Sequence, residues 1–118
     1  MAWLYVFIGG GAGSICRFVL GQWLNRTGGY PWGTLAANSV SCIVLGILVA
    51  YTSKEHLALE WRLLLMTGFC GGFSTFSTFS NEVLQFMRQA DYPAAMLYVG
   101  MSLLVGLFSL WLGLRLLD

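Results

Sequence analysis

The chain has 118 residues, of which 58% are hydrophobic and only 9% are charged. About a quarter of the residues in a soluble domain are charged, so the composition excludes an ordinary globular protein, and a disordered chain as well. A formal net charge of +1 excludes nucleic acid as a partner, because binding to phosphates needs a basic surface. A helix needs about 20 apolar residues to cross the hydrocarbon core of a lipid bilayer. We therefore expect a single all-α membrane domain over residues 1–118.

Four hydrophobic segments are separated by short polar connections. The first connection contains two glycines and Pro31, the second is rich in charged residues, and the third contains Asp91 and Pro93. Such compositions are typical of turns. Short connections favour antiparallel neighbouring helices, with both termini on one side of the membrane. The four expected spans cover residues 1–24, 33–51, 62–87 and 94–117.

The basic residues give almost no preferred orientation in the membrane. Lys54, Arg62 and Arg115 would lie on the side of the termini, against Arg26 and Arg88 on the other side. The side with more basic residues usually faces the cytoplasm. Three basic residues on one side against two on the other allow insertion in both orientations, so that two opposite copies pair as an antiparallel dimer. They equally allow a single orientation that another feature determines.

The first span carries a face of small residues and one arginine. Gly9, Gly13, Arg17 and Gly21 recur at every fourth position and so share one side of a helix. Glycines at this spacing let another helix backbone approach closely, and we expect them to serve packing. An arginine costs about 2.5 kcal/mol or more at the centre of a membrane helix, so Arg17 needs protein or water around it. It either attracts an anion into a vestibule or makes a structural hydrogen bond.

The second and fourth spans each carry a polar stripe. In the second span, Asn38 is the most costly residue to bury. It serves either as an interhelical hydrogen-bonding group or as an amide that coordinates an anion. The stripe of the fourth span is either a packing face or a row of hydroxyl donors. Its members are Tyr98, Ser102, Gly106, Ser109 and Gly113.

The third span has the most unusual sequence. It reads GFCGGFSTFSTFSNE over residues 68–82, with two adjacent glycines followed by hydroxyl and phenylalanine side chains. Each glycine weakens a helix by about 1 kcal/mol relative to alanine. We expect a break in mid-membrane, where free carbonyls bind a cation and the new helix start attracts an anion. A helical wheel places Phe73 with Phe76 and Phe79 on one side. The alternative is a kinked helix that packs through an aromatic seam.

The polar groups inside the spans are mostly hydrogen-bond donors. The amide, the hydroxyls and Arg17 outnumber the one embedded acid, Glu82. Such a lining suits a small anion that accepts hydrogen bonds, and the positive edges of phenylalanine rings suit an anion as well. Polar faces within a membrane also favour an oligomer in which they meet inside the assembly.

The run over residues 68–82 resembles the signature of the bacterial Fluc/CrcB fluoride channels. Two further motifs resemble that family in the same order: GGGAG at residues 9–13, followed by Arg17, and GTLAAN at residues 33–38. The resemblance implies a channel in the bacterial plasma (inner) membrane that passively exports cytoplasmic fluoride and so confers fluoride resistance. It also implies an antiparallel homodimer of dual topology, with two fluoride pores and a structural Na⁺ ion at its centre.

The same resemblance implies roles for individual residues. Backbone carbonyls of Gly71 and Ser74 would hold the Na⁺ ion, while Arg17 and Glu82 would belong to a vestibule or to the fold. Two positions depart from the family pattern: Ser74, where threonine is frequent, and Gly106, where some members have a further serine. The residues of the fluoride pore would be Asn38, Phe76, Ser77, Thr78, Phe79, Tyr98 and Ser102.

Two other functions remain open at this point. A small multidrug-type exporter shares the length, the four spans and the dual topology, but its proton coupling needs an acidic residue in the first span, which has none. An accessory membrane subunit without transport activity would leave the hydroxyl-rich third span unexplained. An enzyme is disfavoured, because the single histidine, His56, has no evident nucleophile or cluster of metal ligands to work with.

Overall fold

The computed structural model describes residues 1–25 and 30–117, and the regular structure in this part of the chain is helical. Three long helices, α1 (Ala2–Leu24), α2 (Trp32–Lys54) and α6 (Tyr92–Leu116), are each long and apolar enough to cross a membrane. The longest dimension of 49 Å also suits a bilayer, which is about 40–45 Å thick with its headgroups. The chain is therefore a multi-pass membrane protein.

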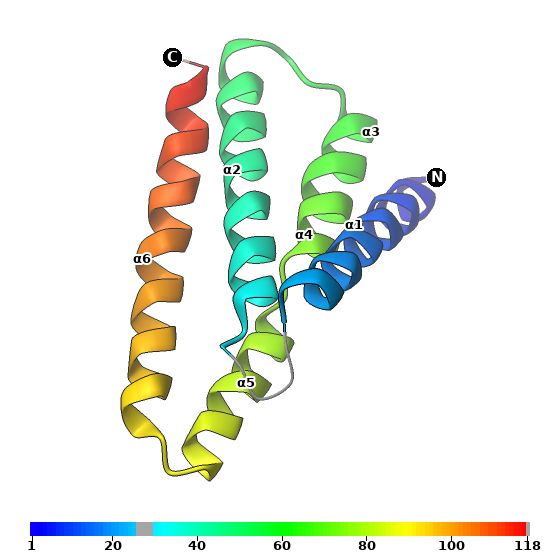
Figure 1. Cartoon of the computed structure of the whole chain (residues 1–118). Helices are drawn as coiled ribbons and strands as arrows, with labels where there is room; N and C mark the ends of the chain where they lie inside the picture. The colour runs from blue at the N-terminus through cyan, green and yellow to red at the C-terminus, as the bar shows by residue number, and fades with distance from the viewer. Residues whose placement is uncertain (26–29, 118) are drawn as a thin grey trace.

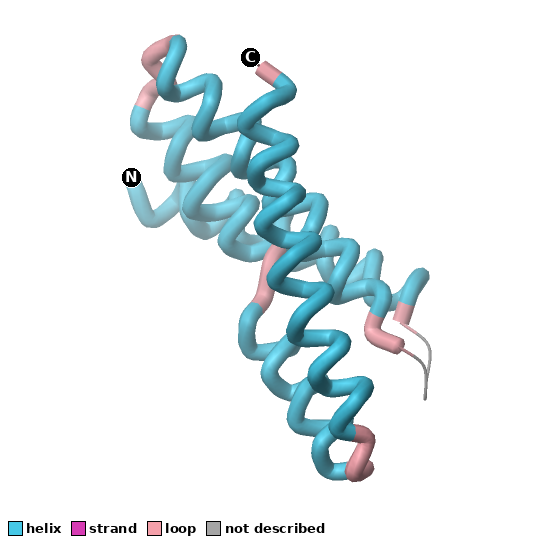
Figure 2. The backbone as a smooth tube through the Cα atoms, turned by 90° about the vertical axis from the view of Figure 1, so that its left-hand side faces the viewer, coloured by secondary structure: helices cyan, strands magenta, loops and turns pink. Residues whose placement is uncertain are grey.

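The third span is divided by a break, as the sequence predicts. It begins with a short helix α3 (Leu59–Arg62), continues as the π-helical segment η1 (Leu63–Cys70) and completes its first half with α4 (Gly71–Phe73). Two extended residues follow, and α5 (Phe76–Arg88) forms the second half. Figure 2 shows the break as a loop in the middle of the molecule.

The helices end within a few residues of the expected span boundaries. Helix α2 begins one residue early and continues to Lys54, because the hydroxyls of Thr52 and Ser53 donate to carbonyls of the preceding turn and so prolong the helix. The second connection is correspondingly shorter than expected. Helix α6 begins at Tyr92, where the side chain of Asp91 accepts a hydrogen bond from the third amide of the helix.

The helices pack across the chain order. Helix α1 lies mainly on η1 and α4, while α2 lies mainly on α6 (Figure 1). Glycines make both contacts: Gly9 and Gly13 of α1 face backbone atoms of the third span, and Gly46 of α2 meets Gly113 of α6. A Cβ atom at any of these positions would collide with a neighbouring backbone. The packing role expected for Gly9 and Gly13 is confirmed.

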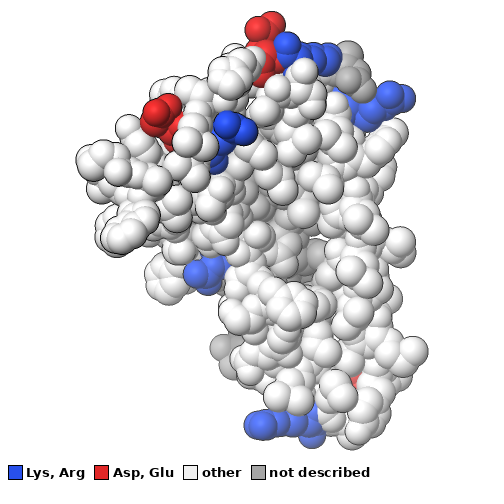
Figure 3. All heavy atoms as spheres, turned by 180° about the vertical axis from the view of Figure 1, so that it is seen from behind, with Lys and Arg blue, Asp and Glu red and all other residues white. Residues whose placement is uncertain are grey.

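The outer surface of the molecule is apolar. Trp3, for example, is 89% exposed, and many leucines and phenylalanines share this exposure. Figure 3 shows the charged side chains mostly toward the two ends, with a largely uncharged belt between them in which one basic side chain stands out. Both termini lie toward the same end (Figure 1), as an even number of spans requires. This distribution fits a protein whose belt is covered by lipid or by another copy.

Candidate functional site

Side chains hold the break in the third span open by taking over backbone hydrogen bonds. The Ser74 N–H still donates to the Cys70 carbonyl and is the last helical bond of the first half. The next amide, Thr75 N–H, donates instead to Oδ1 of Asn38 on α2, at 3.0 Å. Thr75 then caps α5, since its Oγ1 accepts from the Thr78 N–H at 3.3 Å. Threonine is a common residue at this position of a helix.

These two hydrogen bonds release two carbonyl groups. In a continuous helix the Thr75 N–H would donate to the carbonyl of Gly71, and the Thr78 N–H to the carbonyl of Ser74. Both donors are engaged elsewhere, so neither carbonyl has its helical partner. Gly71 is exposed, and a Cβ atom added there would meet nothing within 4 Å. The side of Gly71 on which a side chain would lie is therefore open space.

The break does not fall at the glycine pair. Gly71 and Gly72 are helical within α4, and the chain leaves helical geometry at Ser74 and Thr75, whose ψ angles are 152° and 124°. Gly72 serves packing instead, because a Cβ atom added there would lie 3.0 Å from the Cα of Gly10 on α1. The hydrogen-bonding side chains determine the place of the break, and the flexibility of the glycines does not.

The phenylalanines separate into two groups. Phe73 belongs to the first half of the span, where it is buried with its ring edge-on to Phe69. Its expected place beside Phe76 and Phe79 is wrong, because the break interrupts the helical wheel. Phe76 and Phe79 lie at the start of α5 with ring centroids 6.0 Å apart, and Phe76 is 79% exposed. So exposed a ring near the centre of the span needs lipid or a second chain to cover it.

Hydroxyl groups gather at the start of α5. Thr75 Oγ1 lies 3.2 Å from Ser77 Oγ and donates to Thr78 Oγ1 at 3.4 Å. Asn38 stands at the same place, because its oxygen accepts from the Thr75 amide. An asparagine amide has two N–H donors besides that oxygen, so its nitrogen remains as a donor for another acceptor. The structure thus brings Asn38, Ser77 and Thr78 together at the break.

Two hydroxyls from different helices bind the one embedded acid. Tyr98 Oη donates to Glu82 Oε1 at 2.8 Å, and Thr34 Oγ1 donates to Oε2 at 3.0 Å. Tyr98 is completely buried, and its ring centroid lies 5.1 Å from that of Phe79. Thr34 is absent from the predicted site residues. Its position one turn before Asn38, on the same stripe of α2, is the signal that points to it.

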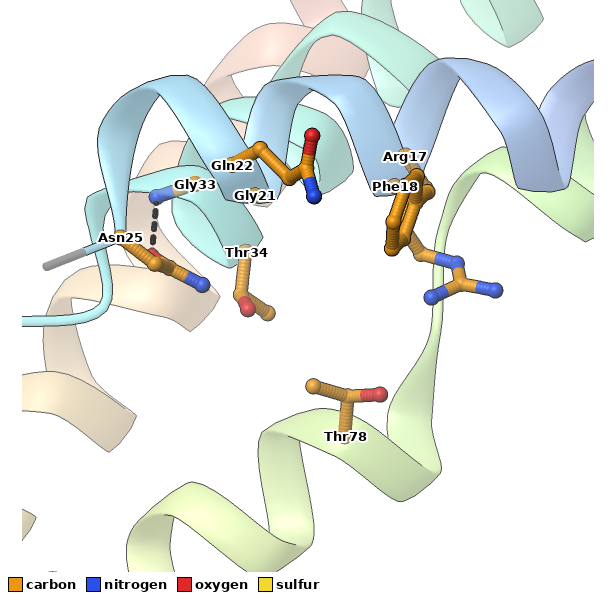
Figure 4. Close-up of a pocket in the computed structure, with 8 residues that line it drawn as sticks. All are labelled: Arg17, Phe18, Gly21, Gln22, Asn25, Gly33, Thr34 and Thr78. Carbon is orange, nitrogen blue, oxygen red and sulfur yellow. Dashed lines mark hydrogen bonds between the residues drawn. The ribbon is translucent and has the colours of Figure 1, made fainter. Parts of the chain in front are cut away.

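Arg17 makes the structural hydrogen bond that its position allows and also borders a cavity. Its Nε donates to the Gly72 carbonyl at 3.4 Å. The guanidinium lies at the edge of a cavity of about 210 Å³, across from Thr78 (Figure 4). Asn25 closes the far end by accepting a hydrogen bond from the Gly33 amide at 2.6 Å. The cavity is lined by Arg17, Phe18, Gly21, Gln22, Asn25, Gly33, Thr34 and Thr78.

The polar stripe of the fourth span serves two purposes. Gly113 packs against the backbone of α2. Ser109, one helical turn before Gly113, is buried as well. Gly106 has open space, since a Cβ atom added there would meet nothing within 4 Å. The Oγ of Ser102 is buried, with no hydrogen-bond partner among the described residues. Tyr98 is the member of the stripe that contacts the site, through Glu82 and Phe79.

The fold and the site define a small multi-pass membrane protein with hydrogen-bond donors gathered at a break in mid-membrane, an arrangement suited to moving ions. The chain belongs to the CrcB family, because the family model described as "CrcB-like protein, Camphor Resistance (CrcB)" matches residues 4–114. The resemblance seen in the sequence is confirmed. Bacterial relatives of the chain carry the name of an ion channel.

Individual relatives match this chain in sequence over nearly its whole length. The chain is 42% identical over 113 residues to a protein named "Fluoride-specific ion channel FluC" from Phocaeicola vulgatus, a match that covers 94% of this chain and 93% of the relative. Proteins of the same name from Oceanobacillus iheyensis and Rhizobium etli are 43% and 39% identical. These two matches cover 96% and 97% of this chain, and 88% and 94% of the relatives.

Proposed function

We propose that the chain is a fluoride channel through which cytoplasmic fluoride leaves the cell passively, down its electrochemical gradient. Relatives that are about 40% identical carry the name of this activity. The observation that carries the proposal is the hydrogen bond from the Thr75 amide to Asn38. This bond opens the third span in mid-membrane and leaves an amide nitrogen and several hydroxyls at the opening.

Fluoride passes between hydrogen-bond donors and ring edges. The amide nitrogen of Asn38 and the hydroxyls of Ser77 and Thr78 replace part of its hydration shell without holding it by a full charge. Phe76 and Phe79 lie beside these donors on α5 and offer their positive ring edges. Tyr98 and Ser102 continue the row of hydroxyls along α6.

The released carbonyls of Gly71 and Ser74 would hold a structural Na⁺ ion. Hard cations prefer oxygen ligands, and a carbonyl that has lost its helical donor is free to act as one. The open space beside Gly71 would let a second copy approach this part of the chain. A bound Na⁺ would offset the partial negative charge of the carbonyls that hold it.

An antiparallel homodimer of dual topology completes the two pores. The exposed ring of Phe76 needs a neighbour in mid-membrane, and the nearly balanced basic residues of the two sides permit both orientations. Arg17 draws anions into the cavity from the water. Glu82 stands further along, and the hydroxyls of Thr34 and Tyr98 offset its negative charge.

Fluoride release from liposomes that contain the purified protein tests this function. A potassium ionophore clamps the voltage, chloride is the comparison ion, and empty liposomes are the control. We expect fast fluoride release with negligible chloride release. Folded dimers that release no fluoride would refute the proposal. Uptake of a cationic drug driven by a proton gradient would then support the exporter class instead.

A further inference from the structure

A tyrosine from the first connection covers the buried end of the site. Tyr30 precedes α2, and its ring lies edge-on to that of Tyr98, with centroids 5.4 Å apart and planes at 84°. It also contacts the rings of Trp32 and Phe86, at 4.7 Å and 6.2 Å. Phe86 lies one helical turn beyond Glu82 on α5, toward the connection to α6. Tyr30 therefore stands past the pair formed by Glu82 and Tyr98, on the side away from the break.

The hydroxyl of Tyr30 is buried and has no hydrogen-bond partner among the described residues. A buried hydroxyl without a partner lowers stability, and phenylalanine would make the same ring contacts without that loss. Burial also raises the pKa of Tyr30 above its ordinary value, so the hydroxyl keeps its proton and acts as a donor. Such a group calls for a partner beyond the described residues, and a bound ion is one that would fit.

A second hydroxyl of the same kind lies close to Tyr98 along the chain. Ser102 follows Tyr98 by one turn along α6, and its Oγ is also buried without a partner in the described part of the chain. The hydroxyl of Tyr98 itself is engaged by Glu82. The hydroxyls of Tyr30 and Ser102 are thus unpaired, while the hydroxyl of Tyr98 is occupied by Glu82.

We propose that Tyr30 is a further donor of the ion path, and that its hydroxyl binds fluoride after the ion has passed Glu82. This inference rests on the proposed fluoride conduction. An anion at this point meets a carboxylate whose neighbouring hydroxyls, from Thr34 and Tyr98, already donate to it. The passage therefore needs a donor that is still unpaired, and Tyr30 offers one at the end of the row.

The variant Tyr30→Phe tests this role, because it removes the hydroxyl and keeps the ring. The measurement is the initial rate of fluoride release from liposomes at a series of fluoride concentrations. We expect a rate lower by roughly tenfold at low fluoride, as for one lost hydrogen bond, and a higher half-saturating concentration. The matched control is Tyr92→Phe, which loses an exposed tyrosine hydroxyl at the start of α6. Its rates and its half-saturating concentration should equal those of the wild type.

The possible outcomes separate this inference from the proposed function. Equal rates for the wild type and Tyr30→Phe overturn the donor role while fluoride conduction stands. A lower rate that comes with a lower unfolding temperature or a loss of dimers also overturns it, because the hydroxyl then serves packing. A slower Tyr30→Phe with unchanged unfolding temperature supports the donor role. A wild-type protein that releases no fluoride removes both proposals.

Discussion

Replacement of Asn38 by alanine should remove stability and fluoride conduction together. Alanine has no acceptor for the Thr75 N–H, which now donates to Asn38 at 3.0 Å in a partly buried place. Removing one partner so that a buried donor is left unsatisfied costs about 1–3 kcal/mol. We expect the free energy of unfolding to fall by about that amount. If the amide returns to the carbonyl of Gly71, the loss is smaller, but the break closes and conduction stops.

The assay for Asn38→Ala pairs denaturant unfolding in detergent, followed by tryptophan fluorescence, with fluoride release from liposomes. The matched control is Ser39→Ala, because the hydroxyl of Ser39 donates only to the Leu35 carbonyl of its own helix, at 2.7 Å. Its stability should change by less than about 0.5 kcal/mol. Asn38→Asp keeps an acceptor for Thr75 but loses the amide donors, so it should retain dimers and lose flux. An Asn38→Ala protein with wild-type stability and wild-type flux would show that this side chain does not hold the break.

Three further perturbations test other parts of the molecule. Gly113→Ala should lower the free energy of unfolding by about 1–3 kcal/mol, because the new Cβ would lie 3.0 Å from the Cα of Gly46. The control Gly106→Ala, in open space on the same helix, should leave the free energy of unfolding unchanged. Equal unfolding curves for the two variants would contradict the packing argument. Phe76→Ile and Phe79→Ile should form dimers and lose fluoride flux by roughly tenfold or more, whereas wild-type flux in both variants would exclude a role for the rings. Exchange of Na⁺ for a large organic cation should weaken the dimer, as measured by size-exclusion chromatography, and an unchanged dimer would mean that the carbonyls hold no ion.

Most of the fold could be predicted from the sequence, because a membrane span is a local property of about 20 consecutive residues. The starts and ends of α1, α2 and α6 follow directly from the apolar runs and the turn residues between them. The boundaries shifted where side chains bond to nearby backbone, as Thr52 and Asp91 do. These bonds are weak signals in a sequence, since the same residues also occur in loops.

The site could be predicted only in part, because its geometry depends on contacts between distant segments. The glycine pair correctly indicated a break, yet its position is determined by Asn38, which is 37 residues away from Thr75 along the chain. Thr34 and Tyr30 are absent from the prediction for the same reason. Their partners, Glu82 and Tyr98, belong to other helices, and only the folded chain brings them together.

The pairing of α1 with the third span and of α2 with α6 has a consequence for how the protein is made. During synthesis the first two helices leave the ribosome well before their partners, so each must be stable in the lipid without the helix that it later contacts. The third span is interrupted and rich in hydroxyls, and it is the segment least able to insert without help. The glycine face of α1, on which the third span packs, is in the bilayer before the third span is inserted. The packing face for the third span is thus made before the third span itself.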